Sequence, residues 1–236
     1  FSDITIVNNI VEQIASGNNT LNTIAAKIGE KEPTVLYSLD KLISVGLVEK
    51  KKCITEEKNK KKTQYVLKDY MFKFWYEFIP KATSVIEIGQ GEIYYQKAVK
   101  PILHSFMGTV FEDMCRYYTL KNGIIGEYGC FITSVGTWWG VENIKDKYGN
   151  MRTQSVDIDV VALSEVDKKA LVGECKFKNE KIDKSIYETL VSRGKLLPAK
   201  YKVSKYILFS LAGYTDWFES LSDEDVVLLT LDSIYE

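Results

Sequence analysis

Two apolar segments separated by a short polar stretch constrain the fold of this chain more than any other feature. Val156–Leu163 and Lys169–Phe177 are each long enough for a strand, and residues 164–168 between them are polar. Runs rich in Val, Leu and Ala are typical of strands that lie inside a sheet covered by helices. The two segments therefore predict a hairpin at the centre of an α/β domain.

Ionisable residues occupy matching places in the two predicted strands. Asp157 and Asp159 lie two residues apart in the first, and Glu174 and Lys176 lie two apart in the second. Side chains two apart on a strand share a face, so we expect Asp159 and Glu174 to converge on one cation. Two carboxylates and the intervening carbonyl of Cys175 form a hard oxygen site that suits Mg²⁺ or Mn²⁺.

The chemistry that this set predicts is phosphodiester hydrolysis. A divalent cation polarises the phosphate and lowers the pKa of a bound water, while Lys176 orients that water or offsets developing charge. Glu112, from a helix predicted over residues 99–120, either completes the metal shell or holds a water. We therefore take Glu112, Asp159, Glu174 and Lys176 as the catalytic candidates, Asp159, Glu174 and Cys175 as the metal ligands, and Asp157 as an accessory acid.

This arrangement resembles the core of PD-(D/E)XK nucleases, which have a restriction-endonuclease-like fold. The expected order is a helix, a strand over residues 130–135, a polar loop over 142–154 and then the acidic hairpin. Strands over 206–210 and 226–231 follow, with a helix over 214–221 between them. A helix over 183–196 carries Arg193, which either contacts a phosphate backbone or belongs to an ordinary surface face. Fold alone does not establish catalysis, because this fold has many binding-only relatives.

The first seventy residues have the pattern of a winged helix-turn-helix. Apolar spacing predicts helices over 7–14, 20–28 and 33–43, with glycines in the joints. Two strands, 47–50 and 63–67, fit a wing with a mobile tip. Seven lysines fall between Lys50 and Lys62, and lysines on a wing can neutralise phosphates. The candidate nucleic-acid contacts are exposed residues of the third helix and the wing: Thr34, Tyr37, Ser38, Lys41, Lys60, Lys61 and Lys62. The alternative is a solvated loop on a module that contacts protein.

The segment that follows carries a more specific resemblance. Residues 69–80 read Asp-Tyr-Met-Phe-Lys-Phe-Trp-Tyr-Glu-Phe-Ile-Pro, a pattern that predicts a buried aromatic helix. This segment resembles the hallmark of a family of predicted ATPases of archaea and bacteria. Further matches lie at Ile86-Glu87-x-Gly89, Gly108-x-x-Phe111-Glu112, Trp138-Trp139-Gly140, Asp157–Ala162 and Gly173–Phe177.

The chain resembles the C-terminal half of the proteins of that family. This resemblance implies an upstream P-loop ATPase domain in the intact protein. No G-x-x-x-x-G-K-[ST] motif occurs in this chain, so we expect no cofactor-binding residues for ATP and no ATP hydrolysis by this chain alone. A chain that opens on Phe1 is expected to be a fragment. The expected organisation is a winged helix over 1–67, a helical aromatic connector over 68–100 and a nuclease-like domain over 101–236.

Composition limits the kinds of partner and the cellular compartment that the sequence allows. The 31 basic and 32 acidic side chains nearly cancel, so affinity for DNA must come from local charge. Four widely spaced cysteines and the absence of a membrane-length apolar run favour a cytoplasmic protein without a membrane partner. The single histidine, His104, is expected to be packed rather than catalytic. Oligomeric state stays open.

Three functions remain compatible with the sequence. The first is a metal-dependent DNA nuclease directed by a winged helix. The second is a non-catalytic DNA-binding or regulatory module in which the acidic cluster is a relic. The third is a transcriptional regulator whose C-terminal domain serves dimerisation or sensing.

Overall fold

The computed structural model describes residues 2–56, 63–145, 149–221 and 223–235. The chain forms two compact units. The first comprises residues 1–52 and 58–102, and the second comprises residues 53–57 and 103–236. The fold class is mixed α/β, with helices in both units and a five-stranded mixed sheet in the second.

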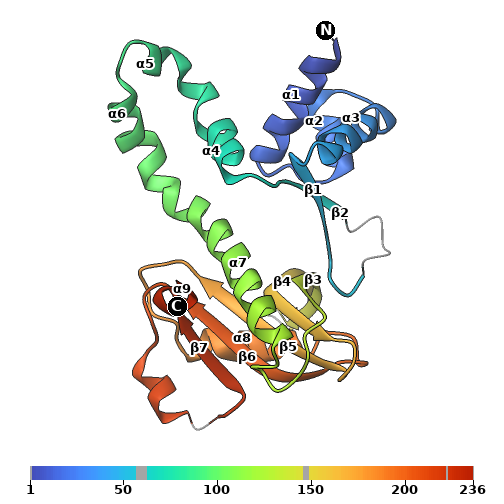
Figure 1. Ribbon diagram of the computed structural model, residues 1–236, viewed down its shortest axis with the longest axis vertical. Helices are drawn as coiled ribbons and strands as arrows, with labels where there is room; N and C mark the ends of the chain where they lie inside the picture. The colour runs from blue at the N-terminus through green and yellow to red at the C-terminus, as the bar shows by residue number, and fades with distance from the viewer. Residues whose placement is uncertain (1, 57–62, 146–148, 222, 236) are drawn as a thin grey trace. The chain divides into compact units, whose positions relative to one another are not determined.

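The first unit begins with three helices and a two-stranded hairpin (Figure 1). The helices are α1 (Ser2–Ala15), α2 (Leu21–Ile28) and α3 (Glu32–Ser44), and the strands β1 (Val48–Lys52) and β2 (Thr63–Leu67) pair antiparallel. The Thr20 side chain caps α2, and Gly29 ends it with a positive φ of 73°. The predicted helices and strands of this segment are confirmed.

A stripe of apolar side chains holds these elements together. Ile10, Ile24, Val35 and Leu39 are completely buried in one core, and Tyr65 and Leu67 of the hairpin join it. Positions 35, 38, 39 and 42 of α3 are all buried, which is the spacing of one helical face. Ser38 therefore lies inside at 1% exposure, and the expectation that it is exposed is wrong.

The aromatic segment forms α4 (Tyr70–Phe78), which Asp69 caps by accepting from the amides of Met71 and Phe72. It continues into η2 (Pro80–Ala82), α5 (Thr83–Glu87), α6 (Gly91–Tyr94) and η3 (Tyr95–Val99). Phe78 is buried, whereas Met71 is 80% and Trp75 46% exposed. The expectation that this stripe is packed core holds only for its C-terminal end.

The second unit is built on a five-stranded sheet of order β3-β4-β5-β6-β7. The strands are β3 (Ser134–Lys145), β4 (Met151–Ser164), β5 (Lys169–Lys176), β6 (Lys202–Ser210) and β7 (Val226–Thr230). The pairs β3/β4 and β4/β5 are antiparallel, and β5/β6 and β6/β7 are parallel. The predicted hairpin of the two apolar segments is confirmed as β4 and β5.

Helices contribute to two separate cores of this sheet. One core joins Leu190 of α8 (Lys184–Gly194) to Val161, Leu163 and Val172. The other joins Phe111 of α7 (Lys100–Ile124) to Val160, Ala162 and Leu171, and α9 (Leu231–Tyr235) adds Ile234. Alternate residues of β4 and β5 thus enter different cores, as expected of strands buried on both faces.

Three predicted elements of this unit differ from the structure. Residues 142–145 and 151–154 were expected in a loop, but they are the paired ends of β3 and β4, with Glu142 opposite Gln154. Most of their side chains are exposed, so their polarity reflects solvent on the hairpin rather than a missing strand. Residues 130–133 precede β3 instead of forming it, and the helix predicted over 214–221 is only the short η4 (Asp216–Ser220).

Residues 53 and 54, directly after β1, are packed against the second unit, whereas the predicted tip over residues 57–62 lies outside the described residues. Cys53 and Ile54 are buried in the core of the second unit. The Ile54 amide donates to the Thr137 carbonyl at 3.1 Å, and the Cys53 thiol lies 3.6 Å from the Trp139 carbonyl. These contacts attach the segment to β3.

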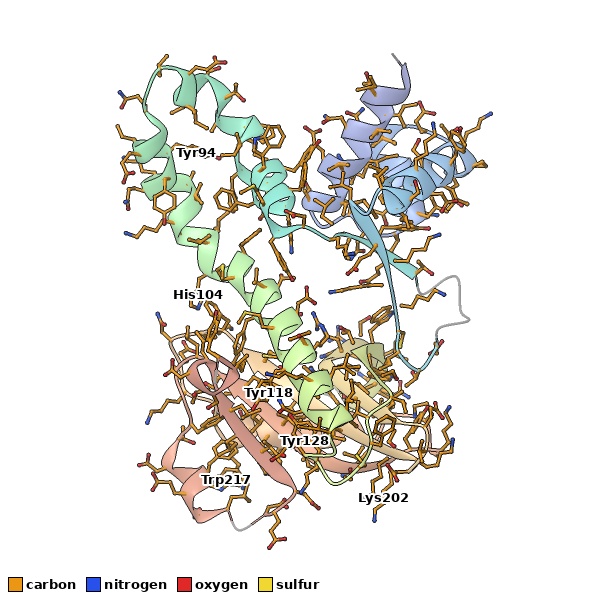
Figure 2. The ribbon with its side chains drawn as sticks, viewed as in Figure 1. Tyr94, His104, Tyr118, Tyr128, Lys202 and Trp217 are labelled. Carbon is orange, nitrogen blue, oxygen red and sulfur yellow. The ribbon has the colours of Figure 1, made fainter. Side chains whose placement is uncertain are left out.

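The single histidine lies on α7, where Figure 2 labels it. Its ring lies 4.9 Å from that of Phe177, centroid to centroid. This is an aromatic packing contact, as expected for His104. Within the described parts of the chain, no helix is both long and apolar enough to cross a membrane.

Candidate active site

The candidate site lies where two central strands stop pairing. The last paired residues of β4 and β5 at this end are Val160 and Gly173. Asp159 and Glu174 are the next residues beyond that pair, so the two carboxylates leave adjacent strands at one level of the sheet. The predicted convergence of these acids thus has its structural basis in the register of the hairpin.

A pocket of about 420 Å³ opens at this point. Its walls include every residue that the sequence singled out in this domain: Glu112, Asp157, Asp159, Glu174, Cys175, Lys176 and Arg193. α7 supplies Glu112, β4 and β5 supply the two acid pairs with Cys175 and Lys176, and α8 supplies Arg193. Ser185, Ile186 and Thr189 of α8, which the sequence reasoning did not select, complete the lining.

Asp159 is held in a strongly acidic environment. One carboxylate oxygen, Oδ2, accepts the Cys175 backbone N–H at 2.9 Å. Burial, then the charges of Glu174 and Glu112, raise the pKa of Asp159 far above the usual range of an aspartate, although the Cys175 amide and Lys176 oppose this. Desolvation and like charge act in the same direction here, so added positive charge stabilises the ionised form.

Lys176 is the cation closest to these acids. Its ammonium lies 2.5 Å from Glu174 Oε1. The Glu174 side chain is 12% exposed and that of Lys176 29% exposed. Burial disfavours the charged lysine, but attraction to Glu174 and Asp159 outweighs burial and raises the pKa of Lys176. The ammonium therefore stays charged beside the carboxylates.

Arg116 connects the helix to the acidic strand, and the sequence reasoning missed it. Its Nη1 donates to the Asp159 carbonyl at 2.7 Å and to Thr137 Oγ1 at 3.1 Å. The guanidinium also forms ion pairs with Asp113 and, at 3.5 Å, with Glu112. The residue is only 9% exposed. The Glu112-x-x-x-Arg116 spacing on an apolar helix was the available signal, since residues four apart share a helix face.

Arg193 of α8 contacts Asp157 of β4. Its Nη1 donates to the Asp157 carbonyl at 3.0 Å and lies 3.8 Å from Asp157 Oδ1. The Asp157 side chain is 66% exposed. In this arrangement the accessory acid contacts a guanidinium.

Two acidic residues of the pocket carry oxygen donors of the type that hard divalent cations prefer. Asp159 and Glu174 offer carboxylate oxygens in a crowded acidic environment, which is the ligand type that Mg²⁺ and Mn²⁺ prefer. The side-chain positions pair Glu174 with Lys176 and Glu112 with Arg116. Among the residues the structure describes, no group of three or more His, Cys, Asp or Glu side chains is gathered closely enough to hold a metal ion.

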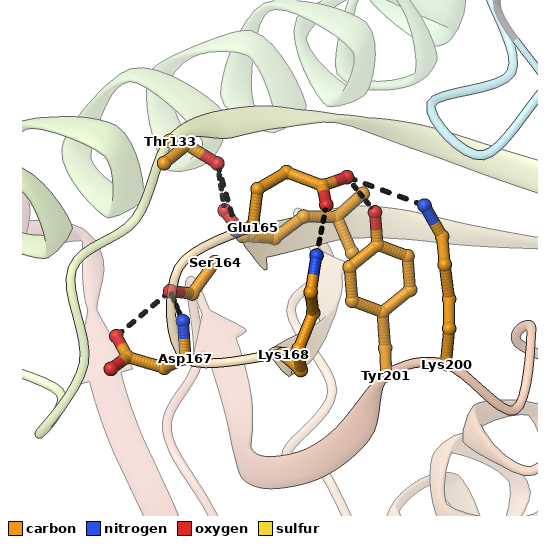
Figure 3. A network of polar contacts seen from close by, with 8 residues as sticks. Thr133, Ser164, Glu165, Asp167, Lys168, Lys200 and Tyr201 are labelled. Atoms are coloured by element: carbon orange, nitrogen blue, oxygen red, sulfur yellow. Dashed lines mark hydrogen bonds and ion pairs between the residues drawn. The ribbon is translucent and has the colours of Figure 1, made fainter.

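A polar network fixes the turn between β4 and β5 at the other end of the hairpin (Figure 3). Glu165 accepts hydrogen bonds from Lys168 and Tyr201, and Lys200 lies 3.4 Å away. These contacts lower the pKa of Glu165 to about 2, with the Tyr201 hydroxyl as the largest cause. Lys168 itself has a positive φ of 54°. The network stabilises the tight connection that sets the register of the two acidic strands.

The residues of the first unit that were predicted to contact nucleic acid differ in their exposure to solvent. Tyr37 is 63% exposed on α3, and the Lys41 ammonium lies 4.3 Å from the centre of its ring. Thr34 is half-buried and Ser38 is buried. Lys60, Lys61 and Lys62 lie outside the described residues. Tyr37 and Lys41 therefore form the exposed part of the predicted α3 surface.

Comparisons with known proteins show similarity without a known activity. The chain is 30% identical over 199 residues to an uncharacterized protein of Methanocaldococcus jannaschii. The match covers 84% of this chain and 42% of that relative, so the chain spans less than half of the relative's length. No solved structure matches the chain. Residues 75–186, which contain Glu112, Asp159 and Glu174, match the model of a family, DUF234, described as archaeal and bacterial proteins of unknown function.

Proposed function

We propose that the second unit is a metal-dependent phosphodiesterase of the PD-(D/E)XK type that cleaves DNA, and that the first unit is a winged-helix DNA-binding module. The observation that carries this proposal is the placement of Asp159 and Glu174 immediately beyond the last pair of β4 and β5. Lys176 and Glu112 line the same pocket. These are the residue types that metal-dependent phosphodiester hydrolysis uses, and their position in one pocket supports the proposal.

The charge of the pocket supports a role for a cation. Four carboxylates and two cationic side chains, Lys176 and Arg193, line it. A phosphodiester is itself an anion, so the acidic cluster of Glu112, Asp159 and Glu174 would repel it unless positive charge were added. A divalent cation supplies that charge and would be held by Asp159, Glu174 and the Cys175 carbonyl. When bound, it polarises the phosphate and makes a water acidic.

The side chains themselves divide the remaining work. Lys176 keeps its charge beside Glu174 and is placed to offset negative charge that develops on the phosphate. Glu112 contributes a carboxylate from α7 and is held by Arg116. Arg116 also fixes the backbone of Asp159, so we assign it a positioning role rather than a catalytic one.

The first unit supplies the DNA-binding part of the proposal. Three short helices followed by an antiparallel hairpin are the elements of a winged helix. Tyr37 and Lys41 project from the exposed face of α3. The P-loop ATPase partner that the family resemblance implies remains part of this proposal, since the matched segment makes up 42% of the Methanocaldococcus relative.

The close pairing of Glu174 with Lys176 favours a second candidate, a non-catalytic DNA-binding or regulatory module. A lysine that neutralises Glu174 removes part of the need for a cation. In that case the acidic cluster holds the sheet and helix together, and the winged helix alone provides function, as in a transcriptional regulator.

A cleavage assay separates the two candidates. Labelled single-stranded, duplex and branched DNA would be incubated with Mn²⁺ and the native chain, Glu174→Gln or Lys176→Met. The exposed Glu188, which pairs with Lys184 outside the pocket lining, gives a matched control, Glu188→Gln. We expect cutting by the native chain and the control and more than a hundredfold loss in both site variants. DNA binding without cutting by all four folded proteins would favour the non-catalytic module.

A further inference from the structure

The α8 wall of the pocket contains a guanidinium nitrogen without a hydrogen-bond acceptor. Arg193 Nε is shielded from solvent and has no hydrogen-bond partner among the described residues. A shielded N–H that makes no hydrogen bond is unfavourable and calls for an explanation. The side chain as a whole is 20% exposed and lines the pocket. Nε itself is shielded, but the exposed part of the guanidinium is within reach of a molecule that enters the pocket.

The other polar groups on this wall already use their protons. Ser185 Oγ donates to Asp183 Oδ1 at 2.6 Å, and Thr189 Oγ1 donates to the Ser185 carbonyl at 2.8 Å. Asp183 also caps α8 by accepting the amides of Ser185 and Ile186. Among the described side chains of the α8 wall, Arg193 Nε is therefore the donor that still lacks an acceptor.

The tether to Asp157 holds this guanidinium without neutralising it fully. Nη1 bonds to the Asp157 carbonyl, but the carboxylate lies 3.8 Å away and is mostly exposed. An exposed ion pair of that length is weak. Arg193 is thus positioned by a neutral acceptor and keeps charge and donors for an anion. A guanidinium offers its N–H groups in a planar fork that suits phosphate oxygens.

Lys176 lies beside Glu174 on the strand side of the pocket, where it serves the phosphate at the acidic cluster and not a second one on α8. The positive charge of the pocket is therefore divided between two walls. Lys176 lies with the acids of β4 and β5, and Arg193 lies on α8. Two separated cationic groups in one pocket fit a ligand that carries two phosphates along a strand.

We infer that Arg193 forms a second phosphate-binding subsite, which holds a phosphate next to the one at the acidic cluster. The ligand is a polynucleotide strand with at least two consecutive phosphodiesters, rather than a small molecule with one. The inference rests on the proposed function for the acidic cluster, but the subsite itself makes its contact without a metal. Asp157 positions Arg193 through its backbone carbonyl.

The test measures binding in EDTA, where no metal-dependent step takes part. Anisotropy of a fluorescent single-stranded 12-mer of thymidylate would be followed across salt concentrations for the native chain, Arg193→Ala and Arg193→Lys. Loss of one phosphate contact is expected to weaken binding about tenfold and to reduce the salt slope by about 0.7 for a single strand. Arg193→Lys keeps the charge but not the fork, so it should restore the slope and only part of the affinity. Thermal unfolding of each variant checks that it is folded.

Lys195→Ala is the matched control, because Lys195 adjoins the end of α8 and does not line the pocket. We expect its slope and affinity to stay within twofold of those of the native chain. Equal losses in Lys195→Ala and Arg193→Ala would show a general charge effect and overturn the subsite. Unchanged binding by Arg193→Ala would overturn it as well, even if the native chain cleaves DNA. Arg193-dependent binding in a chain that never cleaves would keep the subsite and reject the nuclease.

Discussion

The backbone N–H of Cys175 donates to Asp159 Oδ2 at 2.9 Å, at the point where β4 and β5 cease to pair. The Asp159 carboxylate thus takes the place of the next backbone acceptor of β4, and this hydrogen bond fixes its position. On its other side β5 continues to pair with β6 as far as Lys176. The acidic site therefore forms where the pairing of β4 with β5 ends, while the continued pairing of β5 with β6 keeps β5 in place.

The two glycines of α7 predict opposite effects when each is replaced by alanine. A Cβ at Gly123 would lie 2.7 Å from Ile132 Cβ, whereas a Cβ at Gly108 would meet nothing within 4 Å. Alanine favours a helix by about 1 kcal/mol over glycine, but overpacking costs about 1–3 kcal/mol. In urea unfolding we expect Gly108→Ala to stabilise the protein by up to about 1 kcal/mol and Gly123→Ala to destabilise it by about 1–2 kcal/mol. Stabilisation by both would contradict the packing of residue 123 on Ile132.

Removal of the Arg116 guanidinium should destabilise the second unit. Arg116→Met leaves the Asp159 carbonyl and Thr137 without their donor. Hydrogen bonds to a charged group contribute about 1.5–3 kcal/mol, and the ion pairs to Asp113 and Glu112 add little because both acids are partly exposed. We expect a loss of about 2–3 kcal/mol in urea unfolding. Lys121→Met, at an exposed position on the same helix, should change stability by less than about 0.5 kcal/mol, and a similar loss in both would argue against the bridging role.

Lys176→Met should affect cation binding and catalysis in opposite directions. Without the ammonium, the carboxyl groups of Glu174 and Asp159 lose a positive charge that competes with a bound cation. We expect Mn²⁺ to bind roughly tenfold more tightly, about 1.4 kcal/mol, while DNA cleavage is lost. Calorimetric titration with Mn²⁺ measures the first effect. Weaker Mn²⁺ binding in this variant would mean that Lys176 maintains the structure of the site instead of competing with the cation.

The turn network gives a pH dependence with a defined sign. The hydrogen bonds of Glu165 lower its folded-state pKa to about 2 from 4.5. A group whose folded pKa is depressed adds stability above the unfolded pKa and loses it as pH falls through the folded one. The native chain should therefore be more stable than Glu165→Gln above about pH 5, and the difference should shrink between pH 4.5 and 2.

The comparison is made from urea midpoints at each pH. Glu180→Gln, at an exposed position, is the matched control and should give a difference from the native chain that does not change over this range. A Glu165→Gln difference that is constant with pH would contradict the network drawn in Figure 3.

The sequence predicted the parts of the fold whose pattern is local. A continuous run of apolar residues predicts a buried strand such as Val156–Leu163, and apolar residues at helical spacing predict α3. Ser38 lies on the same buried face of α3, but its polar side chain led to the prediction that it is exposed. The exposed ends of β3 and β4 were missed, because a strand with solvent on both faces has no apolar alternation to detect. Its pairing is held by backbone hydrogen bonds, which do not depend on residue type.

Within the candidate site, residue types were predictable but their partners were not. Glu112, Asp159, Glu174 and Lys176 all line one pocket, as the hairpin and helix required. The bond from Arg116 to the Asp159 carbonyl joins residues 43 positions apart, and that from Arg193 to the Asp157 carbonyl joins residues 36 apart. Both acceptors are backbone oxygens, which every residue carries, so no sequence pattern marks them.

The most direct test of the central claim is the number of Mn²⁺ ions bound by the folded chain, measured from the free Mn²⁺ signal in electron paramagnetic resonance. The variants to compare are the native chain, the double variant Asp159→Asn with Glu174→Gln, and the control Glu188→Gln. We predict at least one tightly bound Mn²⁺ in the native chain and the control, and loss of that ion in the double variant. Equal Mn²⁺ binding by all three folded proteins, or none by the native chain, would contradict a metal site at Asp159 and Glu174.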